Sequence, residues 1–254
     1  MSKRIISGAI IALITVLALY YDGLIFNIVL SFIGLYSAYE YISVMKKRFD
    51  LLLYIISIIS IFSLIYLNDY ASDIILIELI ILLSIAVFNP NENYVDMAGL
   101  LLFCILIGFA LYHMNHIEHL NKWMLGYIFI ISYLTDVFAY FIGMFFGKHK
   151  LNERVSPKKT IEGSIGGLLF GSICSFLWAY YFKFFGYPSY FFILSSILLP
   201  IISEIGDLVF SLIKRHYEVK DFSNLIPGHG GILDRLDSNI FCIITFGVLM
   251  NILL

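Results

Sequence analysis

Charged residues are scarce in this chain. Only 13% of its 254 residues are Asp, Glu, Lys or Arg, whereas 61% are hydrophobic and the mean hydropathy is +0.93. Soluble domains usually contain about 25% charged residues, and a soluble globule of this length could not hide so much apolar surface from water. The composition therefore excludes an ordinary soluble domain and predicts a protein whose solvent is lipid.

Cysteine and net charge are also low, and several motifs are missing. Cys104, Cys174 and Cys242 stand singly in apolar stretches, which is typical of packing residues and not of metal or redox sites. The formal net charge is −2, so nothing indicates a nucleic-acid partner. A P-loop kinase is excluded because the chain lacks Gly-x₄-Gly-Lys-Ser/Thr. The only segment near a CDP-alcohol phosphotransferase motif, 22–27, lacks its Ala-Arg.

Long apolar runs recur along the whole chain, and each could cross the hydrocarbon core, which needs about 20 such residues. The first run lies after Lys3 and Arg4, but Leu17 to Tyr21 make a poor cleavage site, so we interpret it as a retained anchor. We predict an all-α integral membrane protein with about nine transmembrane helices. The expected spans are 5–20, 24–44, 51–67, 74–88, 97–114, 123–147, 163–184, 189–213 and 239–254.

Lysine and arginine on the connections predict the orientation. With nine spans and a cytoplasmic N-terminus, 14 of the 16 Lys and Arg lie inside, and only Lys122 and Lys183 lie outside. The positive-inside rule favours this arrangement, which puts the C-terminus outside. It also makes the two long polar connections, 148–162 and 214–238, cytoplasmic. We divide the single membrane domain into N-terminal helices, 1–122, and a catalytic region, 123–254.

The segment from Ser211 to Asp237 holds the densest polar chemistry in the chain. Basic residues alternate there with acids, and a Pro-Gly-His-Gly-Gly run lies between them. Carboxylates suit Mg²⁺, cations suit phosphate oxygens, and glycines let backbone N–H groups approach an anion. The pattern is typical of a site for a phosphate–metal complex, although a Gly-His-Gly-Gly run by itself is more often a turn.

Just upstream, polar residues recur at helical spacing. Ser203, Asp207, Ser211 and Lys214 share one stripe of the eighth span, and Glu204 lies beside it. A carboxylate at membrane depth is costly and indicates a functional site. The alternative is a helix end that reaches the interface, where Asp207 pairs with Lys214 or with water.

Residues 211–237 resemble the signature of the phosphatidate cytidylyltransferase (CDP-diacylglycerol synthase) family, a Ser followed by Lys-Arg, Lys-Asp, His-Gly-Gly and Asp-Arg-x-Asp. Two further blocks, Asp136 to Phe141 and Ser156 to Gly163, resemble other segments of that family. The resemblance covers roughly 132–239. Ile161, Val137 and Glu204 depart from the family pattern, and the role of Glu204 stays open. The matching positions of the signature are Ser211, Lys214, Arg215, Lys220, Asp221, Pro227, His229, Gly230, Gly231, Asp234, Arg235 and Asp237.

This resemblance implies transfer of a cytidylyl group from CTP to phosphatidate, with Mg²⁺ as the cofactor and pyrophosphate as the second product. It implies Asp207 and Asp234 as first metal ligands, with Asp221 and Asp237 next. The residues expected to be catalytic are Asp207, Lys214, Lys220, Asp221, Asp234 and Asp237. Those expected to bind substrate are Lys158, Lys159, Ser211, Arg215, His229, Gly230, Gly231 and Arg235.

Some of these roles have structural alternatives. His229 either polarises a phosphate oxygen or holds the turn. Lys158 and Lys159 either reach the phosphates of CTP or serve as a topology signal that binds anionic headgroups. No separate general base is expected, because phosphatidate is already largely ionised at neutral pH.

The rival functions are a CTP-dependent transferase for another lipid phosphate and a non-catalytic membrane protein that binds or transports lipid. A transporter typically buries its site at the midplane between repeated halves, whereas here the polar residues crowd one side. The expected partners are CTP, phosphatidate and the bilayer, with a homodimer left open and no nucleic acid. We expect a bacterial inner membrane, with the active site facing the cytoplasm.

Overall fold

The structure of the protein is a computed structural model. It describes residues 13, 15–17, 20–21, 23–46, 49–182, 187–226, 228 and 230–254. Most of the first predicted span, 5–20, lies outside these residues. Almost all of the remainder is helical, because a backbone in lipid must satisfy its hydrogen bonds within its own segment.

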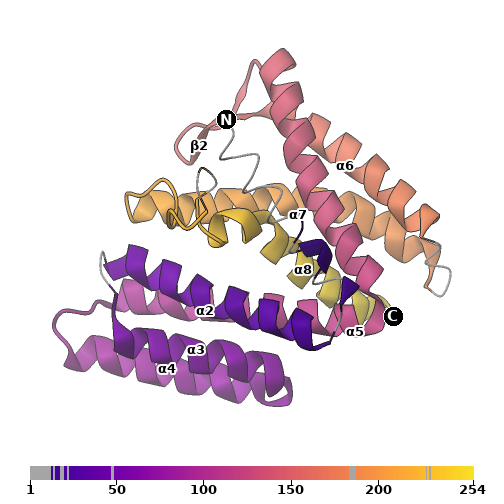
Figure 1. Cartoon of the computed structure of the whole chain (residues 1–254). Helices are drawn as coiled ribbons and strands as arrows, with labels where there is room; N and C mark the ends of the chain where they lie inside the picture. The colour runs from indigo at the N-terminus through magenta and orange to yellow at the C-terminus, as the bar shows by residue number, and fades with distance from the viewer. Residues whose placement is uncertain are drawn as a thin grey trace. The chain divides into compact units, whose positions relative to one another are not determined.

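Seven long helices follow one another along the described chain (Figure 1). A 3₁₀ turn, Asn68–Tyr70, precedes α4, and a two-stranded hairpin of β1, Lys150–Asn152, and β2, Ser156–Thr160, lies between α5 and α6. The helices are α2 Leu24–Lys46, α3 Leu51–Tyr66, α4 Ala71–Phe88, α5 Tyr94–Phe146, α6 Ile161–Tyr181, α7 Ser189–His216 and α8 Leu233–Leu253.

Six helices in the described part of the chain are long and apolar enough to cross a membrane. They are α2, α4 with its preceding turn, α5, α6, α7 and α8, whereas α3 has only 16 residues. The described chain is therefore nearly all-α, with helices that could span a membrane, as predicted. The count of nine and the orientation of the N-terminus stay predictions.

Two predicted spans, 97–114 and 123–147, both lie in α5. This helix is interrupted at Asn121, whose backbone is non-helical with φ −165° and ψ 105°. The Asn121 side chain accepts a hydrogen bond from the Trp123 N–H at 3.0 Å, as an N-cap does. The second part of α5 thus begins with its own cap.

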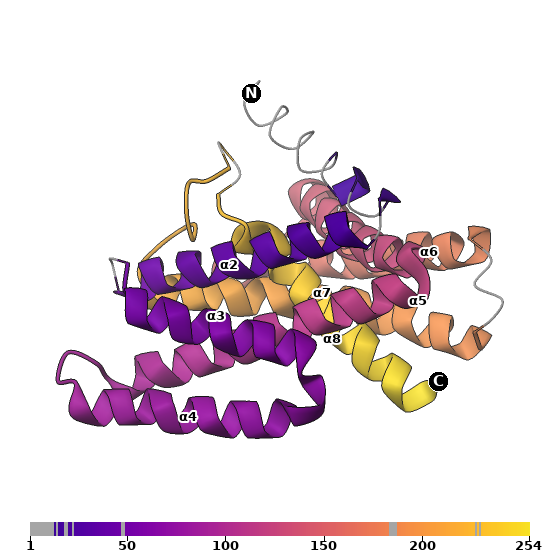
Figure 2. The same cartoon turned by 60° about the horizontal axis from the view of Figure 1, so that its bottom comes forward.

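The chain forms two compact units. Unit 1 comprises Met1–His116 and Val219–Arg235, and in it α2, α3 and α4 lie side by side (Figures 1 and 2). Apolar contacts join these helices to the first part of α5: the rings of Tyr41 and Phe103 stack with centroids 4.2 Å apart. The core of unit 1 is therefore a bundle of antiparallel helices.

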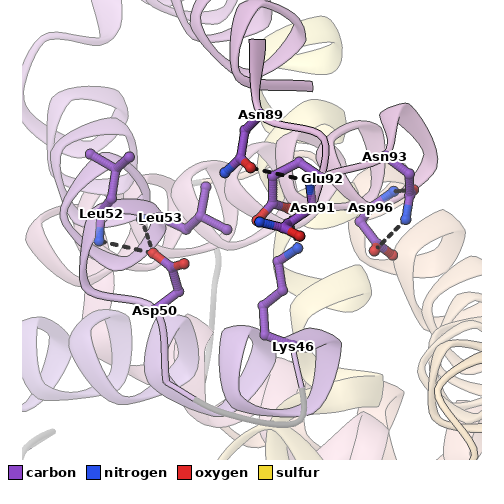
Figure 3. Close-up of polar contacts among 9 residues, drawn as sticks. All are labelled: Lys46, Asp50, Leu52, Leu53, Asn89, Asn91, Glu92, Asn93 and Asp96. Atoms are coloured by element: carbon purple, nitrogen blue, oxygen red, sulfur yellow. Dashed lines mark hydrogen bonds and ion pairs between the residues drawn. The ribbon is translucent and has the colours of Figure 1, made fainter. Parts of the chain in front are cut away.

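One end of unit 1 is lined by polar side chains (Figure 3). Asp50 caps α3 by accepting the N–H groups of Leu52 and Leu53. Lys46, at the end of α2, forms an ion pair with Glu92 in the connection between α4 and α5. The connections that follow α2 and α4 therefore lie at the same end of the bundle.

Unit 2 comprises Ile117–Glu218 and Leu236–Leu254, and in it α6 packs closely against α5 and α7. A Cβ added at Gly163 would lie 2.6 Å from the Ala139 carbonyl oxygen, and one at Gly167 would lie 2.7 Å from that of Thr135. Glycines spaced four residues apart let two helix backbones approach in lipid. This approach fixes the start of α6, and the hairpin before it, against α5.

Candidate active site

The hairpin of β1 and β2 in unit 2 positions one lysine, Lys159, beside a cluster of carboxylates. Successive residues of a strand point to opposite sides, and in β2 Lys158 is exposed while Lys159 is largely covered. The Lys159 ammonium lies 2.7 Å from the Asp207 carboxylate of α7. The two adjacent lysines therefore have different surroundings, and a difference between them was predicted from the sequence without deciding which lysine would face the site.

The base of the hairpin is tied to the start of α6. Thr160 caps this helix by accepting the Gly163 N–H at 3.1 Å. The Glu162 carboxylate accepts the backbone N–H groups of Lys148 and His149 at 3.0 and 3.1 Å. These bonds hold the two ends of the hairpin together, so that Lys159 is presented from a fixed base.

The polar stripe of α7 faces the same cluster. Ser203, Ser211 and Lys214 are buried, and the Lys214 ammonium lies 4.0 Å from the Asp237 carboxylate of α8. Asp207 of α7 is paired with Lys159, and Asp237 of α8 has Lys214 as its neighbour. The helical spacing thus predicted correctly that Asp207 and Lys214 share a face.

Two further carboxylates complete the cluster in unit 2. Asp136 of α5 accepts the Ser238 hydroxyl at 3.4 Å and interacts electrostatically with Lys159 and Asp207. Glu204 accepts the Ser164 hydroxyl at 2.5 Å and lies 3.9 Å from the Lys159 ammonium. Its other oxygen, Oε1, is buried and has no hydrogen-bond partner among the described residues.

Acidic residues outnumber basic residues in the unit 2 cluster. Asp136, Glu204, Asp207 and Asp237 provide four carboxylates, but the ammonium groups are those of Lys159 and Lys214. Burial would by itself lower the Lys159 pKa, but the neighbouring carboxylates, Asp207 foremost, outweigh burial and raise it above its ordinary value. Lys159 therefore carries a full positive charge at neutral pH. Each acid of the cluster that is ionised in this partly buried setting needs a cation or hydrogen-bond donors beside it.

The donor set of this cluster fits Mg²⁺. All four acids offer hard oxygen ligands, and one of these oxygens is buried without a partner. Among the described residues, no group of three or more His, Cys, Asp or Glu is gathered so that it could hold a metal ion by itself. Mg²⁺ usually takes one or two protein carboxylates and completes its coordination with water and substrate phosphates.

In unit 1, two carboxylates organise the glycine-containing part of the signature. Asp234 Oδ2 accepts the N–H groups of Phe222 and Gly231 at 2.8 and 2.9 Å. Glu40 of α2 accepts the Ser223 hydroxyl at 2.6 Å and the N–H groups of Ile232 and Leu233, both at 2.9 Å. Residues 222–223 and 231–233 are therefore held together by two acids.

The glycines of this segment are required by its shape. Gly230 has a φ of +85°, which favours glycine. A Cβ at Gly231 would collide with the Glu40 carboxylate. Gly230 and Gly231 therefore let the chain turn tightly and let a carboxylate approach the backbone.

The structure brings only some of the predicted site residues together. Asp207, Lys159, Lys214 and Asp237 meet in unit 2. Asp234, Gly230 and Gly231 form the folded segment of unit 1, and His229 lies outside the described residues. The remaining predicted residues are Lys158, Arg215, Lys220, Asp221 and Arg235, which are exposed, and Ser211, which is buried. The individual roles of all these residues stay predictions.

Two acids of these sites were given no role from the sequence. Asp136 was part of a matching block without an assigned function, and Glu40 was overlooked. Both occur within predicted spans, where a carboxylate by itself indicates a functional site. That rule, applied to every span, would have found them.

Comparison with known proteins identifies the family. The profile described as "Cytidylyltransferase family" matches residues 2–253. The phosphatidate cytidylyltransferase of Bacillus subtilis is 31% identical over 254 residues, covering 95% of this chain and 94% of the relative. That of Staphylococcus haemolyticus is 39% identical over 198 residues, covering 74% and 72%. These matches confirm the resemblance carried by residues 211–237, and the chain belongs to the cytidylyltransferase family.

Proposed function

We propose that this protein is a phosphatidate cytidylyltransferase, which converts CTP and phosphatidate to CDP-diacylglycerol and pyrophosphate. The carrying observation is the unit 2 cluster, in which β2, α5, α7 and α8 converge with four carboxylates and two lysines. The names of the bacterial relatives support the same reaction. Their origin and the predicted charge split also support a bacterial inner membrane, with the cluster facing the cytoplasm.

In the proposed reaction, a phosphate oxygen of phosphatidate bonds to the α-phosphorus of CTP. The bond from that phosphorus to the bridging oxygen breaks, and pyrophosphate leaves with the electron pair. Both reactants are anions, so the main barrier is their mutual repulsion. Fixed positive charges lower this barrier by positioning and neutralising the phosphates.

We propose Lys159 and Lys214 as the main cations that serve this purpose. Each is oriented by a carboxylate, Lys159 by Asp207 and Lys214 by Asp237. A lysine has three N–H donors, so each can hold its carboxylate and still donate to a phosphate oxygen. Arg215, Lys220 and Arg235 are proposed to bind the remaining phosphate oxygens.

We propose Asp207 in unit 2 and Asp234 in unit 1 each as a residue that binds Mg²⁺; in unit 2, Asp136, Glu204 and Asp237 surround Asp207. When bound, the ion would supply further neutralisation of the phosphate charge. The two N–H donors on Asp234 Oδ2 fix the direction of that carboxylate, and such partners commonly tune a metal ligand.

The test uses purified protein in detergent with phosphatidate, radiolabelled CTP and Mg²⁺. We expect label to enter lipid with an equal amount of pyrophosphate, ATP to be a poor substitute, and EDTA to abolish the reaction. Label that appears only with another lipid phosphate as acceptor would show a related transferase. No labelled lipid with any acceptor would contradict enzymatic function.

A further inference from the structure

Glu40 is a buried acid within an apolar helix, and nothing in the proposed chemistry uses it. Its exposed fraction is 0%. All its hydrogen bonds described above go to residues 223–233, more than 180 positions later in the chain. A carboxylate in such a setting is costly unless donors surround it. The three donors from one segment indicate that Glu40 serves that segment.

The first structural role of Glu40 is to cap the N-terminus of α8. The first N–H groups of a helix have no partner within the helix, and a side-chain oxygen normally accepts them. Ile232, directly before α8, has no acceptor in its side chain. Glu40 supplies the missing oxygens from α2, because it accepts the N–H groups of both Ile232 and Leu233.

Glu40 also occupies the position at the N-terminus of α8 where another anion could bind. An uncapped helix N-terminus is a ready site for phosphate. Here the Ile232 and Leu233 N–H groups are already taken by Glu40, and that of Gly231 by Asp234. These three N–H groups therefore already have acceptors and are not free to bind a phosphate.

We propose that Glu40 is a positioning residue of the transferase. Its carboxylate, supplied by the N-terminal half of the chain, holds Ser223 and the start of α8 in the arrangement that binds CTP. This proposal rests on the proposed function. It goes beyond it by giving the helices before the signature a part in nucleotide binding.

The first experiment tests whether Glu40 holds the start of α8, and it does not depend on enzyme activity. Amide hydrogen exchange is followed in wild-type protein and in Glu40→Gln, in the same detergent. Glu78→Gln is the matched control, because Glu78 is another buried acid of unit 1 whose described bond goes to Ser60 of α3. We expect at least tenfold faster exchange at Ile232 and Leu233 in Glu40→Gln, and wild-type rates there in Glu78→Gln. Unchanged exchange in Glu40→Gln would overturn the proposal.

The second experiment separates positioning from general stability. We expect Glu40→Gln to raise the KM for CTP at least fivefold while the KM for phosphatidate changes less than twofold. Glu40→Asp, which keeps the charge, should recover part of the loss, and Glu78→Gln should leave both constants near wild type. A similar rise in the KM for both substrates would mean that Glu40 only stabilises the fold. An equal rise in the KM for CTP in Glu78→Gln would mean the same, and either result would overturn the proposal.

Two outcomes distinguish this proposal from the proposed function. If wild-type protein makes no labelled lipid, the proposed function is wrong. The exchange measurement then still decides whether Glu40 holds the start of α8. If Glu40→Gln cannot be recovered from membranes, Ser223→Ala carries the same test, because it removes one donor to Glu40 and keeps the carboxylate. Wild-type kinetics and exchange in Ser223→Ala and Glu40→Asp together would then contradict the proposal.

Discussion

Lys158 and Lys159 are neighbours in sequence with different surroundings in the structure. Lys159 is paired with Asp207, whereas Lys158 is exposed on the other side of β2. We expect Lys159→Ala to lower kcat/KM for CTP at least tenfold, equivalent to about 1.4 kcal/mol of barrier. Lys158→Ala is the control and should stay within about threefold. Equal small losses in both variants, restored by anionic lipid, would mean that the pair only anchors the hairpin.

Asp207 lies where α7 meets the hairpin lysine, and it is the proposed metal ligand with the most acidic surroundings. Asp207→Asn keeps the shape and removes one charge. We expect at least a tenfold loss in rate, about 1.4 kcal/mol, and a higher Mg²⁺ concentration for half-maximal activity. Asp73→Asn, at an exposed position in the first turn of α4, is the control. A normal metal requirement in Asp207→Asn would place the ligands elsewhere.

At the scale of helices, the close approach of α5 and α6 depends on residues without side chains. A Cβ at Gly167 meets backbone atoms of α5 that cannot swing aside, and overpacking of this kind costs about 1–3 kcal/mol. We expect Gly167→Ala to lower the Tm in detergent and to reduce activity by displacing the hairpin. Leu169→Ala, at an exposed position of the same helix, should change neither. An unaltered Tm in Gly167→Ala would show that α6 can shift freely.

The sequence predicted those parts of the site that depend on local spacing. Asp207 and Lys214 were placed on one face because a helix repeats every 3.6 residues. The pairing of Lys159 with Asp207 could not be predicted in this way, because it needs the hairpin to fold back toward α7. The hairpin itself is two short strands within a polar connection, with no clear alternation of apolar residues.

Contacts between distant segments were the least predictable. Glu40 and Ser223 are separated by 183 positions, so no local pattern joins them. The interruption of α5 at Asn121 falls between the predicted spans 97–114 and 123–147, so the break itself was predicted, whereas the helical conformation of the residues just after 114 was not. The family, in contrast, could be recognised from the sequence, because the polar residues of its signature lie close together along the chain.

For the whole molecule, the distribution of positive charge predicts which ends face the cytoplasm. In a chain without its native cysteines, a new Cys at Lys150 or Glu218 should react only with reagents that reach the cytoplasm. A new Cys at Asp69 or His116, or one added after Leu254, should react from outside. Labelling of the hairpin from outside would reverse the orientation and contradict the proposed access of cytoplasmic CTP.

The short length of α3 has a consequence for the lipid around it. Its 16 residues extend about 24 Å, less than the ~30 Å of an average hydrocarbon layer. Tilting would shorten its span further, so it cannot remedy this mismatch, and where α3 crosses the membrane we expect the bilayer around it to thin. Vesicles of short-chain phosphatidylcholine should therefore support faster turnover than long-chain vesicles with the same phosphatidate content. Lengthening α3 by one apolar turn should move this preference toward thicker membranes.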